Sequence, residues 1–367
     1  MKTPDLPLRP SQVKHRLIFC FALICALSFG YFANSKRQQL SPLTKAKQTK
    51  APKSPKRTKP HPMKIRGVTL SCFGWGAAWA TPLMYNSMKE LRSLGSNWIS
   101  YHPYSWINND GSIRFSRSLS QPTVMNPLRF GKTLGVKTLL KPHIGYWGSR
   151  FSWRGSITFQ SEAGWKRFFD SYERWIVVQA QMAQAGKADL FSVGLEYKLT
   201  EHREKEWRRI IKAVRKVYKG KILYAANWDT YHKIKFWDAL DFIGIQAYFP
   251  ISKKSNPSEK DLHKGWDKIF PVLRRFAKKH KKKIIFTELG YNYSSRAASH
   301  PWEHTQGGPN AGQIKKRCIR VALKRVAKES FILGVFLWKW FPSSRSISSN
   351  FTLQYPAMKK IIKKAWK

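Results

Sequence analysis

The chain has 367 residues, of which 42% are hydrophobic and 14% aromatic, so it can bury one large core or two smaller ones. This composition excludes wholesale disorder and fibrous repeats, and four cysteines in this length exclude a disulfide framework. With 68 Lys and Arg against 20 Asp and Glu, the net charge is +48, and the excess is not confined to one tail. Such a field attracts polyanions, or it reflects a basic proteome, and it does not bear on the fold.

The N-terminal part divides into segments of different composition. Residues 1–14 form a basic tail, and residues 15–34 contain an uncharged apolar run that would span roughly 25 Å as a helix. That length is at the short end for crossing a bilayer, and basic residues on both sides leave the orientation open. We expect a signal anchor, because Tyr31 is unfavourable at the −3 position of the best cleavage site. If the segment is cleaved, the protein is secreted.

Residues 35–62 are rich in Lys, Pro, Ser and Thr and contain almost no apolar side chains. They cannot bury enough surface to fold, so they predict a disordered basic linker. The folded domain at 63–367 is then expected outside the cytoplasm, in the periplasm or at the cell surface, held to the membrane by the N-terminal helix.

From residue 63 onward, apolar runs rich in β-formers alternate with helical patterns. Strands are expected at 65–73, 97–106, 136–146, 190–197, 221–228, 242–249, 283–291 and 332–341. Helices are expected at 82–94, 162–185, 204–218, 261–279 and 311–328. Near-continuous apolar strands are typical of a parallel sheet covered on both faces, and eight of them predict an α/β fold, the closed (β/α)8 TIM barrel.

The competing fold is an open, doubly wound sheet that binds a dinucleotide. Its glycine fingerprint would have to lie at 74–79, but Trp79 occupies the position of the third glycine and is too bulky there. A pair of histidines, His300 and His304, lies in an expected loop and lacks the glutamate of a zinc-binding helix. We therefore expect neither a nucleotide nor a metal site.

Two glutamates stand out because they interrupt apolar strands. Glu196 ends the fourth strand (FSVGLEY), and Glu288 lies near the end of the seventh (IIFTELGY). A carboxylate in such a place is costly unless it is paired or used in chemistry. Glycosidic bond cleavage requires two carboxylates across a cleft, separated by roughly 5–5.5 Å in retaining enzymes. The plain alternative is that each glutamate pairs with a neighbouring Lys or Arg.

Aromatic and polar residues are expected at the same end of the barrel, where barrel enzymes place their reactive groups. The aromatic candidates for stacking on sugar rings are Trp75, Trp228, Tyr248, Trp338 and Trp340. The polar candidates for hydrogen bonds to sugar hydroxyls are His102, Lys141, His143 and Gln246. Each one alone is more often a core or rim residue, and only their clustering favours a carbohydrate site.

These features resemble the clan A glycoside hydrolases and, within the clan, family 113, the β-mannanase-like enzymes. The resemblance covers about residues 64–342 and is carried by RGVTLSCFGWG, LLKPHI, VGLEY, FTELGY and FLWKW. It implies that Glu196 is the acid/base, that Glu288 is the nucleophile hydrogen-bonded by Tyr248, and that Trp338 or Trp340 floors the subsite of the reacting sugar. One departure is Leu195, which stands where much of the clan has an Asn before the acid/base.

The sequence is therefore consistent with two functions. The first is a retaining β-glycoside hydrolase, β-mannanase-like, that acts on a β-linked oligo- or polysaccharide without a cofactor. The alternative is a non-catalytic, membrane-anchored barrel that binds anionic envelope polysaccharide. A monomer is expected, and no specific nucleic-acid partner, because the sequence has no recognised reader motif. Cys72 and Cys318 are interpreted as a buried thiol pair, and a disulfide cannot be inferred from their positions.

Overall fold

The computed structural model describes residues 63–304, 306–343 and 350–367. The expected basic tail (1–14), signal anchor (15–34) and linker (35–62) lie outside the described residues. Within the described part, no helix is both long enough and apolar enough to cross a membrane.

Eight parallel strands close into a barrel, as the sequence predicts. Their order around the barrel is β1 (Ile65–Leu70), β11 (Ile332–Trp340), β10 (Ile284–Leu289), β9 (Phe242–Gln246), β8 (Lys221–Asn227), β7 (Leu190–Leu195), β5 (Lys137–Leu140) and β2 (Trp98–Tyr101). Most positions in these strands are buried, because the barrel interior covers one face and the outer helices cover the other. The TIM barrel is thus confirmed.

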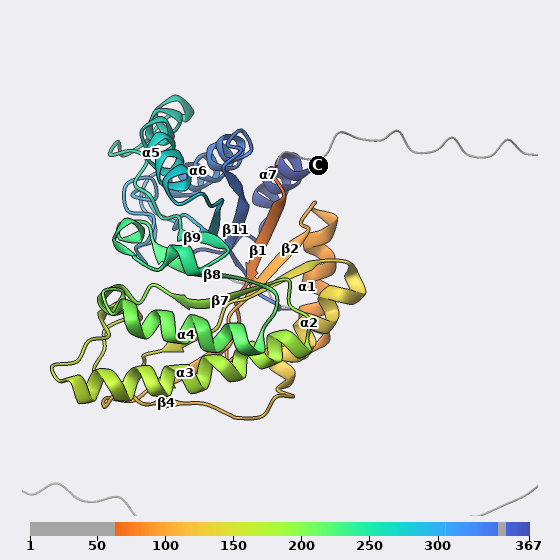
Figure 1. Ribbon diagram of the computed structural model, residues 1–367. Coiled ribbons are helices and arrows are strands. Elements are labelled where there is room, and N and C mark those ends of the chain that lie inside the picture. Colours follow the sequence, from red (N-terminus) through yellow and green to blue (C-terminus); the bar gives the residue numbers. More distant parts are fainter. Residues whose placement is uncertain (1–62, 305, 344–349) are drawn as a thin grey trace, which may run out of the picture. The chain divides into compact units, whose positions relative to one another are not determined.

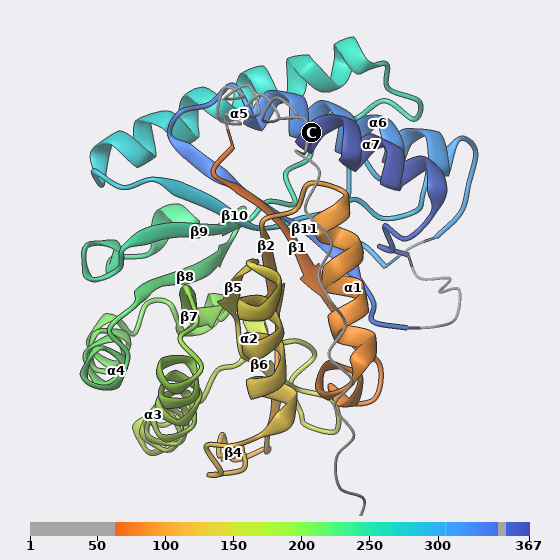
Figure 2. The ribbon, with the colours of Figure 1, turned by 90° about the vertical axis from the view of Figure 1, so that its right-hand side faces the viewer.

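Helices pack around the outside of the strands (Figures 1 and 2). They are α1 (Pro82–Ser93), α2 (Pro122–Leu134), α3 (Glu162–Ala185), α4 (Glu204–Val217), α5 (Glu259–Lys279), α6 (Ala311–Val326) and α7 (Pro356–Trp366). Several begin at side-chain caps that the sequence encodes. Thr81 accepts a hydrogen bond from the Leu83 amide before α1, and Ser258 and Asp261 cap each other's backbone at the start of α5.

Two helices were not among those expected from the sequence. The α2 pattern is obscured by Pro127 in its interior and by the Ser- and Pro-containing stretch before it. The helix ends at Gly135, which adopts φ 62°, a conformation that glycine accommodates without strain. The C-terminal α7 packs its buried Met358, Ile362 and Trp366 onto the core.

The connection from β8 to β9 replaces the usual helix with two short 3₁₀ turns. These turns are Tyr231–Lys233 and Trp237–Ala239, and Trp237 is fully buried with its indole N–H donating to the Tyr231 carbonyl. The indole therefore fills the volume that a helix would otherwise cover.

A small second sheet prolongs one side of the barrel mouth. The expected strands at 97–106 and 136–146 are each divided, and their distal parts form β3 (Tyr104–Ile107) and β6 (His143–Gly145). These two pair in parallel, and β4 (Ile113–Arg114) pairs with β3 in antiparallel fashion. As a result, side chains after β2 and β5 are carried beyond the barrel rim to form a wall.

Strand β11 has an irregular register against β1 that reorients its last residues. Val68 pairs with Leu337, but Leu70 pairs with Trp340. Between these two pairs β11 advances three residues while β1 advances two, so β11 contains one extra residue. At the other end of the pairing, Gly334 lies so close to the Ile65 carbonyl that an added Cβ would sit 1.8 Å from its oxygen. The Trp338–Lys339 peptide bond is cis.

The two cysteines that the sequence suggested as a buried pair are both free. Cys318 is fully buried, whereas Cys72 is only half-buried and donates to the Phe73 carbonyl. The expectation of a buried pair is wrong, because Cys72 follows β1 at the barrel mouth and is only partly covered where it packs against the edge of the core.

Candidate active site

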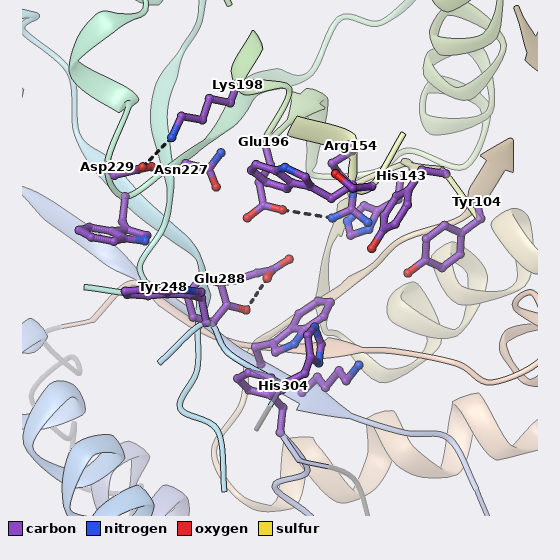
Figure 3. A pocket seen from close by; sticks show the side chains of 18 of the residues that line it. Tyr104, His143, Arg154, Glu196, Lys198, Asn227, Asp229, Tyr248, Glu288 and His304 are labelled. Atoms are coloured by element: carbon purple, nitrogen blue, oxygen red, sulfur yellow. Dashed lines mark hydrogen bonds and ion pairs between the residues drawn. The ribbon is translucent and has the colours of Figure 1, made fainter. Parts of the chain in front are cut away.

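A cavity of about 690 Å³ opens at the carboxyl ends of the barrel strands (Figure 3). Its size is in the range of small-molecule sites, and its place is where barrel enzymes hold their reactive groups. Its lining comprises Tyr104, His143, Tyr146, Trp147, Ser152, Trp153, Arg154, Glu196, Lys198, Asn227, Trp228, Asp229, Tyr248, Glu288, Trp302, His304, Trp338, Lys339 and Phe351. Both glutamates singled out by the sequence are present, and their carboxyl groups point into this one cavity.

Glu288 is held by partners on two other strands of the barrel. Tyr248, just after β9, donates its hydroxyl to Oε2 at 2.6 Å. The Lys141 ammonium, just after β5, forms a salt bridge with Oε1 and lies wholly out of solvent. Because both carboxylate oxygens accept a donor and one donor is a cation, the ionised form of Glu288 is stabilised in a buried place.

Glu196 lies directly after β7, and its backbone is turned into the left-handed region with φ 54°. Its amide N–H donates to the Ala225 carbonyl at 2.9 Å, which keeps the residue attached to β8. Its carboxylate pairs with the Arg154 guanidinium at 3.1 Å. Arg154 belongs to a short 3₁₀ turn, Arg154–Ser156, in the loop between β6 and α3.

Burial raises the pKa of Glu196, and the negative charge of Glu288 raises it further, while Arg154 acts in the opposite direction. The two carboxyl groups, which line the same cavity, are therefore close enough to affect each other's protonation. The pKa of Lys141 is lowered by burial, and the charge of Glu288 opposes that shift.

The histidines at this end of the barrel form a buried stack behind the cavity wall. The rings of His102 and His143 lie 4.4 Å apart, and burial lowers the pKa of both well below the usual value. They are therefore neutral at ordinary pH. His143 reaches the cavity, whereas His102 lies behind it, against Trp79 and Trp338.

Aromatic rings form much of the cavity surface. Trp338 lies 5.5 Å beneath the Lys141 ammonium, measured to the ring centroid, and so stands beside Glu288. Trp228 and Trp302 stack at 5.2 Å on another part of the lining. Flat apolar faces next to hydrogen-bonding groups are the surfaces on which sugar rings stack.

Several residues predicted to bind substrate lie outside the cavity lining. Trp75 is 59% exposed and packs its ring on Trp106 beyond the wall. Gln246 is fully buried and accepts a hydrogen bond from Thr287. His102 and Lys141 act only through neighbours, since His102 stacks on His143 and Lys141 holds Glu288. All four remain near the site, but none of them forms its surface.

The choice between Trp338 and Trp340 is decided by the irregular register of β11. Strict alternation would place both rings on one face, yet the additional residue turns Trp338 into the cavity and Trp340 into the core. Trp340 is fully buried, so its predicted place in the floor of the site is wrong. Leu195 is fully buried too and offers no polar group to a sugar.

The sequence analysis missed other lining residues, among them Tyr104, Arg154, Asn227, Trp302, His304 and Lys339. Arg154 carries no signal, because it is one basic loop residue among many. Asn227 and Lys339 could have been found, because each is a polar residue near the end of an apolar strand. Asn227 is 7% exposed, and its side-chain amide nitrogen has no partner among the described residues.

Comparisons with known proteins place the chain within one enzyme family. The model of Glycoside Hydrolase Family 113 matches residues 68–351. The chain belongs to this family. No curated protein matched the sequence.

Among solved structures, the GH113 β-mannanase AaManA from Alicyclobacillus acidocaldarius, in complex with ManMIm, is 25% identical with a TM-score of 0.72. The alignment covers 82% of this chain and 96% of that one. A GH113 β-1,4-mannanase complex is 22% identical with a TM-score of 0.73, covering 82% of this chain and 98% of that one. The protein is thus a glycoside hydrolase of the β-mannanase-like type, and the resemblance read from its motifs is confirmed.

Among the described residues, no group of three or more His, Cys, Asp or Glu could hold a metal ion.

Proposed function

We propose that this family 113 protein is a retaining β-glycoside hydrolase with Glu288 as nucleophile and Glu196 as general acid and base. The observation that carries the proposal is the contrast between two carboxylates that share one cavity. Glu288 is fixed by a buried ammonium and a phenol, which favour its ionised form. Glu196 has a raised pKa, which favours its protonated form. One carboxylate held by a cation and a phenol, beside a second carboxyl group with a raised pKa, suits double displacement.

In the first step, a carboxylate oxygen of Glu288 attacks the anomeric carbon of the bound sugar. The bond to the glycosidic oxygen breaks, and that oxygen takes the proton of Glu196 as it leaves. The products of the step are a glycosyl ester on Glu288 and an ionised Glu196. Arg154 then stabilises the charge that appears on Glu196, at 3.1 Å.

In the second step, Glu196 acts as a base. Ester formation removes the negative charge of Glu288, which had contributed to the raised pKa of Glu196. Glu196 then takes a proton from water, the water oxygen attacks the anomeric carbon, and Glu288 leaves as a carboxylate. Lys141 and Tyr248 receive that carboxylate in the geometry they held at the start.

For the substrate, we propose a β-linked glycan of the mannan type, with the reacting sugar stacked on Trp338. The solved relatives named above are β-mannanases, which supports this choice. Asn227 and the neutral His143 line the cavity, and their side-chain nitrogens are buried without a partner among the described residues, so they would reach sugar hydroxyls after the side chains turn. In this site Asn227 would make the polar contact that Leu195 cannot make.

The test separates the two glutamates by chemical rescue with azide on an activated aryl β-mannoside. Glu288→Ala should lose turnover and recover it with azide, giving the α-glycosyl azide, because azide then replaces the nucleophile. Glu196→Ala should give the β-glycosyl azide, because azide attacks the intermediate without needing a base. Glu90→Ala on α1, which removes a surface glutamate paired with Lys359, is the matched control and should keep full activity.

A sugar product of inverted configuration, followed by NMR at early times, would overturn the retaining mechanism. Full activity of Glu288→Ala would overturn the assignment of the nucleophile.

We also propose that the enzyme works outside the cytoplasm, anchored by residues 15–34. Fractionation of cells that express the full chain tests this. Recovery of the intact chain in the soluble cytoplasmic fraction would contradict it.

A further inference from the structure

Each acidic side chain that lines the cavity forms a salt bridge with a basic one, and one lysine of the lining forms none among the described residues. Three acids face the cavity, and each has its own basic partner. Glu196 pairs with Arg154 at 3.1 Å, Asp229 with Lys198 at 2.9 Å, and Glu288 with Lys141 behind the wall. Lys339 is the cavity cation that forms no salt bridge within the described parts of the chain, although the charge of Glu288 acts on it from a distance.

Lys339 is held in the cavity by its backbone. Its amide N–H donates to the Phe351 carbonyl, and its own carbonyl accepts from the Leu353 amide, both at 3.1 Å. Its ammonium lies 4.9 Å from the centroid of Trp338 and 5.0 Å from that of Phe341. Ring faces attract the charge, but they do not accept the three N–H donors, and none of these has a hydrogen-bond partner among the described residues.

The residues outside the described part offer no obvious acid for this lysine. The sequence of 344–349 contains no Asp or Glu, residue 305 is a threonine, and the sole acid in residues 1–62 is Asp5. Burial lowers the pKa of Lys339 to about 8, so the ammonium is mostly protonated at neutral pH. A protonated, half-buried ammonium whose donors have no partner within 63–304, 306–343 and 350–367, with a stacking ring nearby, is a receptor for an anion on a sugar.

A second basic hollow adjoins the first. The two hollows share Trp302, and the second is lined by Lys253, Lys254, Arg296 and His300. Lys254 and Arg296 have acidic partners, Asp261 and Glu303, while Lys253 has none among the described residues. A glycan chain leaving the catalytic cavity past Trp302 would therefore meet further positive charge.

We infer that the substrate is an acidic β-linked glycan, and that Lys339 determines this specificity by pairing with an oxyanion group on the sugar stacked on Trp338. The inference rests on the proposed function and deepens it. The oxyanion is a carboxylate on the sugar or a sulfate ester of one of its hydroxyls, and the same ammonium would bind either.

The test uses substrates matched in everything except charge. These are β-1,4-linked mannose oligomers, the same oligomers oxidised to mannuronate, and the same oligomers sulfated at the 6-hydroxyl. The full chain is assayed for kcat/KM on each at low ionic strength. Preference for an acidic oligomer is expected, and the mannuronate and sulfate arms show which oxyanion is used.

Lys339→Met should lower the ratio of acidic to neutral kcat/KM by about tenfold or more, the worth of a charge-assisted hydrogen bond. Lys339→Arg should keep most of the preference. Lys132→Met, which removes the same charge from an exposed place on α2, should leave the ratio unchanged and so excludes an effect of net charge.

Two outcomes would overturn the inference while leaving the proposed hydrolase intact. One is equal activity of the parent chain on neutral and acidic oligomers. The other is an equal loss on both oligomers in Lys339→Met, which would make Lys339 a ligand for hydroxyls. If the parent chain cleaves none of the oligomers and no aryl glycoside, the proposed function itself fails.

Discussion

The two glutamates of the cavity are supported in different ways. Glu288 lies within β10, and its partners stand at the ends of the adjacent strand β9 and of β5 across the barrel, so the barrel itself fixes the arrangement. Glu196 lies just past a strand, with its backbone in the left-handed region and its cation supplied by a loop. A nucleophile must attack in one direction, whereas an acid/base must gain and lose a proton. The rigid and the adjustable surroundings match these two tasks.

The largest loss of activity is expected from removing Lys141, the cation that pairs with Glu288. Lys141→Met leaves a buried carboxylate without its ammonium, which costs about 3–5 kcal/mol, so kcat/KM should fall by about 100- to 5,000-fold where that cost is borne by the reacting state. Hydrolysis of an aryl β-mannoside measures this, with circular dichroism to confirm folding. Lys132→Met on the surface of α2 is the control, and parent-like activity of Lys141→Met would contradict the support described for Glu288.

A smaller loss is expected from the second partner on the same side. Tyr248→Phe removes the 2.6 Å hydrogen bond to Glu288, and a hydrogen bond to a charged group is worth about 1.5–3 kcal/mol, so the rate should fall about 10- to 100-fold. Tyr218→Phe is the matched control, because it too removes a buried phenol hydroxyl, one that donates to the Ala188 carbonyl outside the cavity. Equal losses in the two variants would make the effect one of folding.

For Glu196 and its partner Arg154, the expected effect is a change in the pH dependence of kcat/KM. Arg154 lowers the pKa of Glu196, so Arg154→Met should raise that pKa further and keep the acid protonated to higher pH. The alkaline limb of the kcat/KM profile should therefore move to higher pH. Arg150→Met in the same loop is the control. An unmoved alkaline limb would show that Glu196 is not the group that titrates there.

The smallest effect on activity is expected at Glu201, which lies outside the cavity. Burial raises its pKa to about 8, and the Tyr224 hydroxyl donates to it at 3.0 Å. The folded chain then holds a proton that the unfolded chain releases near its usual pKa of about 4.3. Between those values the folded state binds more protons, so stability falls as pH rises and levels off above about 8.

Glu201→Gln should flatten this dependence. The free energy of unfolding in urea, measured at about pH 5 and about pH 9, tests the change. An identical pH dependence in the variant and the parent chain would show that Glu201 is ionised in the folded state.

Much of the barrel and the centre of the site could be predicted because the signals are local. The apolar strands fix the fold, and a charged residue at the end of such a strand marks the site, as Lys141, Glu196 and Glu288 do. The expected helix at 162–185 agrees in full with α3. The N-terminal anchor and linker stay predictions.

The other features of the site and fold could not be predicted, because they depend on tertiary geometry that no short sequence pattern encodes. The register irregularity of β11 separates Trp338 from Trp340, and it depends on how that strand meets β1. Arg154 reaches the cavity through the path of a long loop. Helix α2 contains Pro127 and lacks a clear side-chain cap, so its identity follows from tertiary packing.

The left-handed backbone at Glu196 has a further consequence. A residue with a Cβ pays about 1–2 kcal/mol for that conformation, whereas glycine adopts it freely. Glu196→Gly would therefore relieve conformational strain while deleting the proposed proton donor. Lys187 and Lys281 adopt the same conformation at φ 52°, so the backbone alone does not mark a catalytic position. If Glu196 is the acid/base, Glu196→Gly should raise the free energy of unfolding while it abolishes turnover.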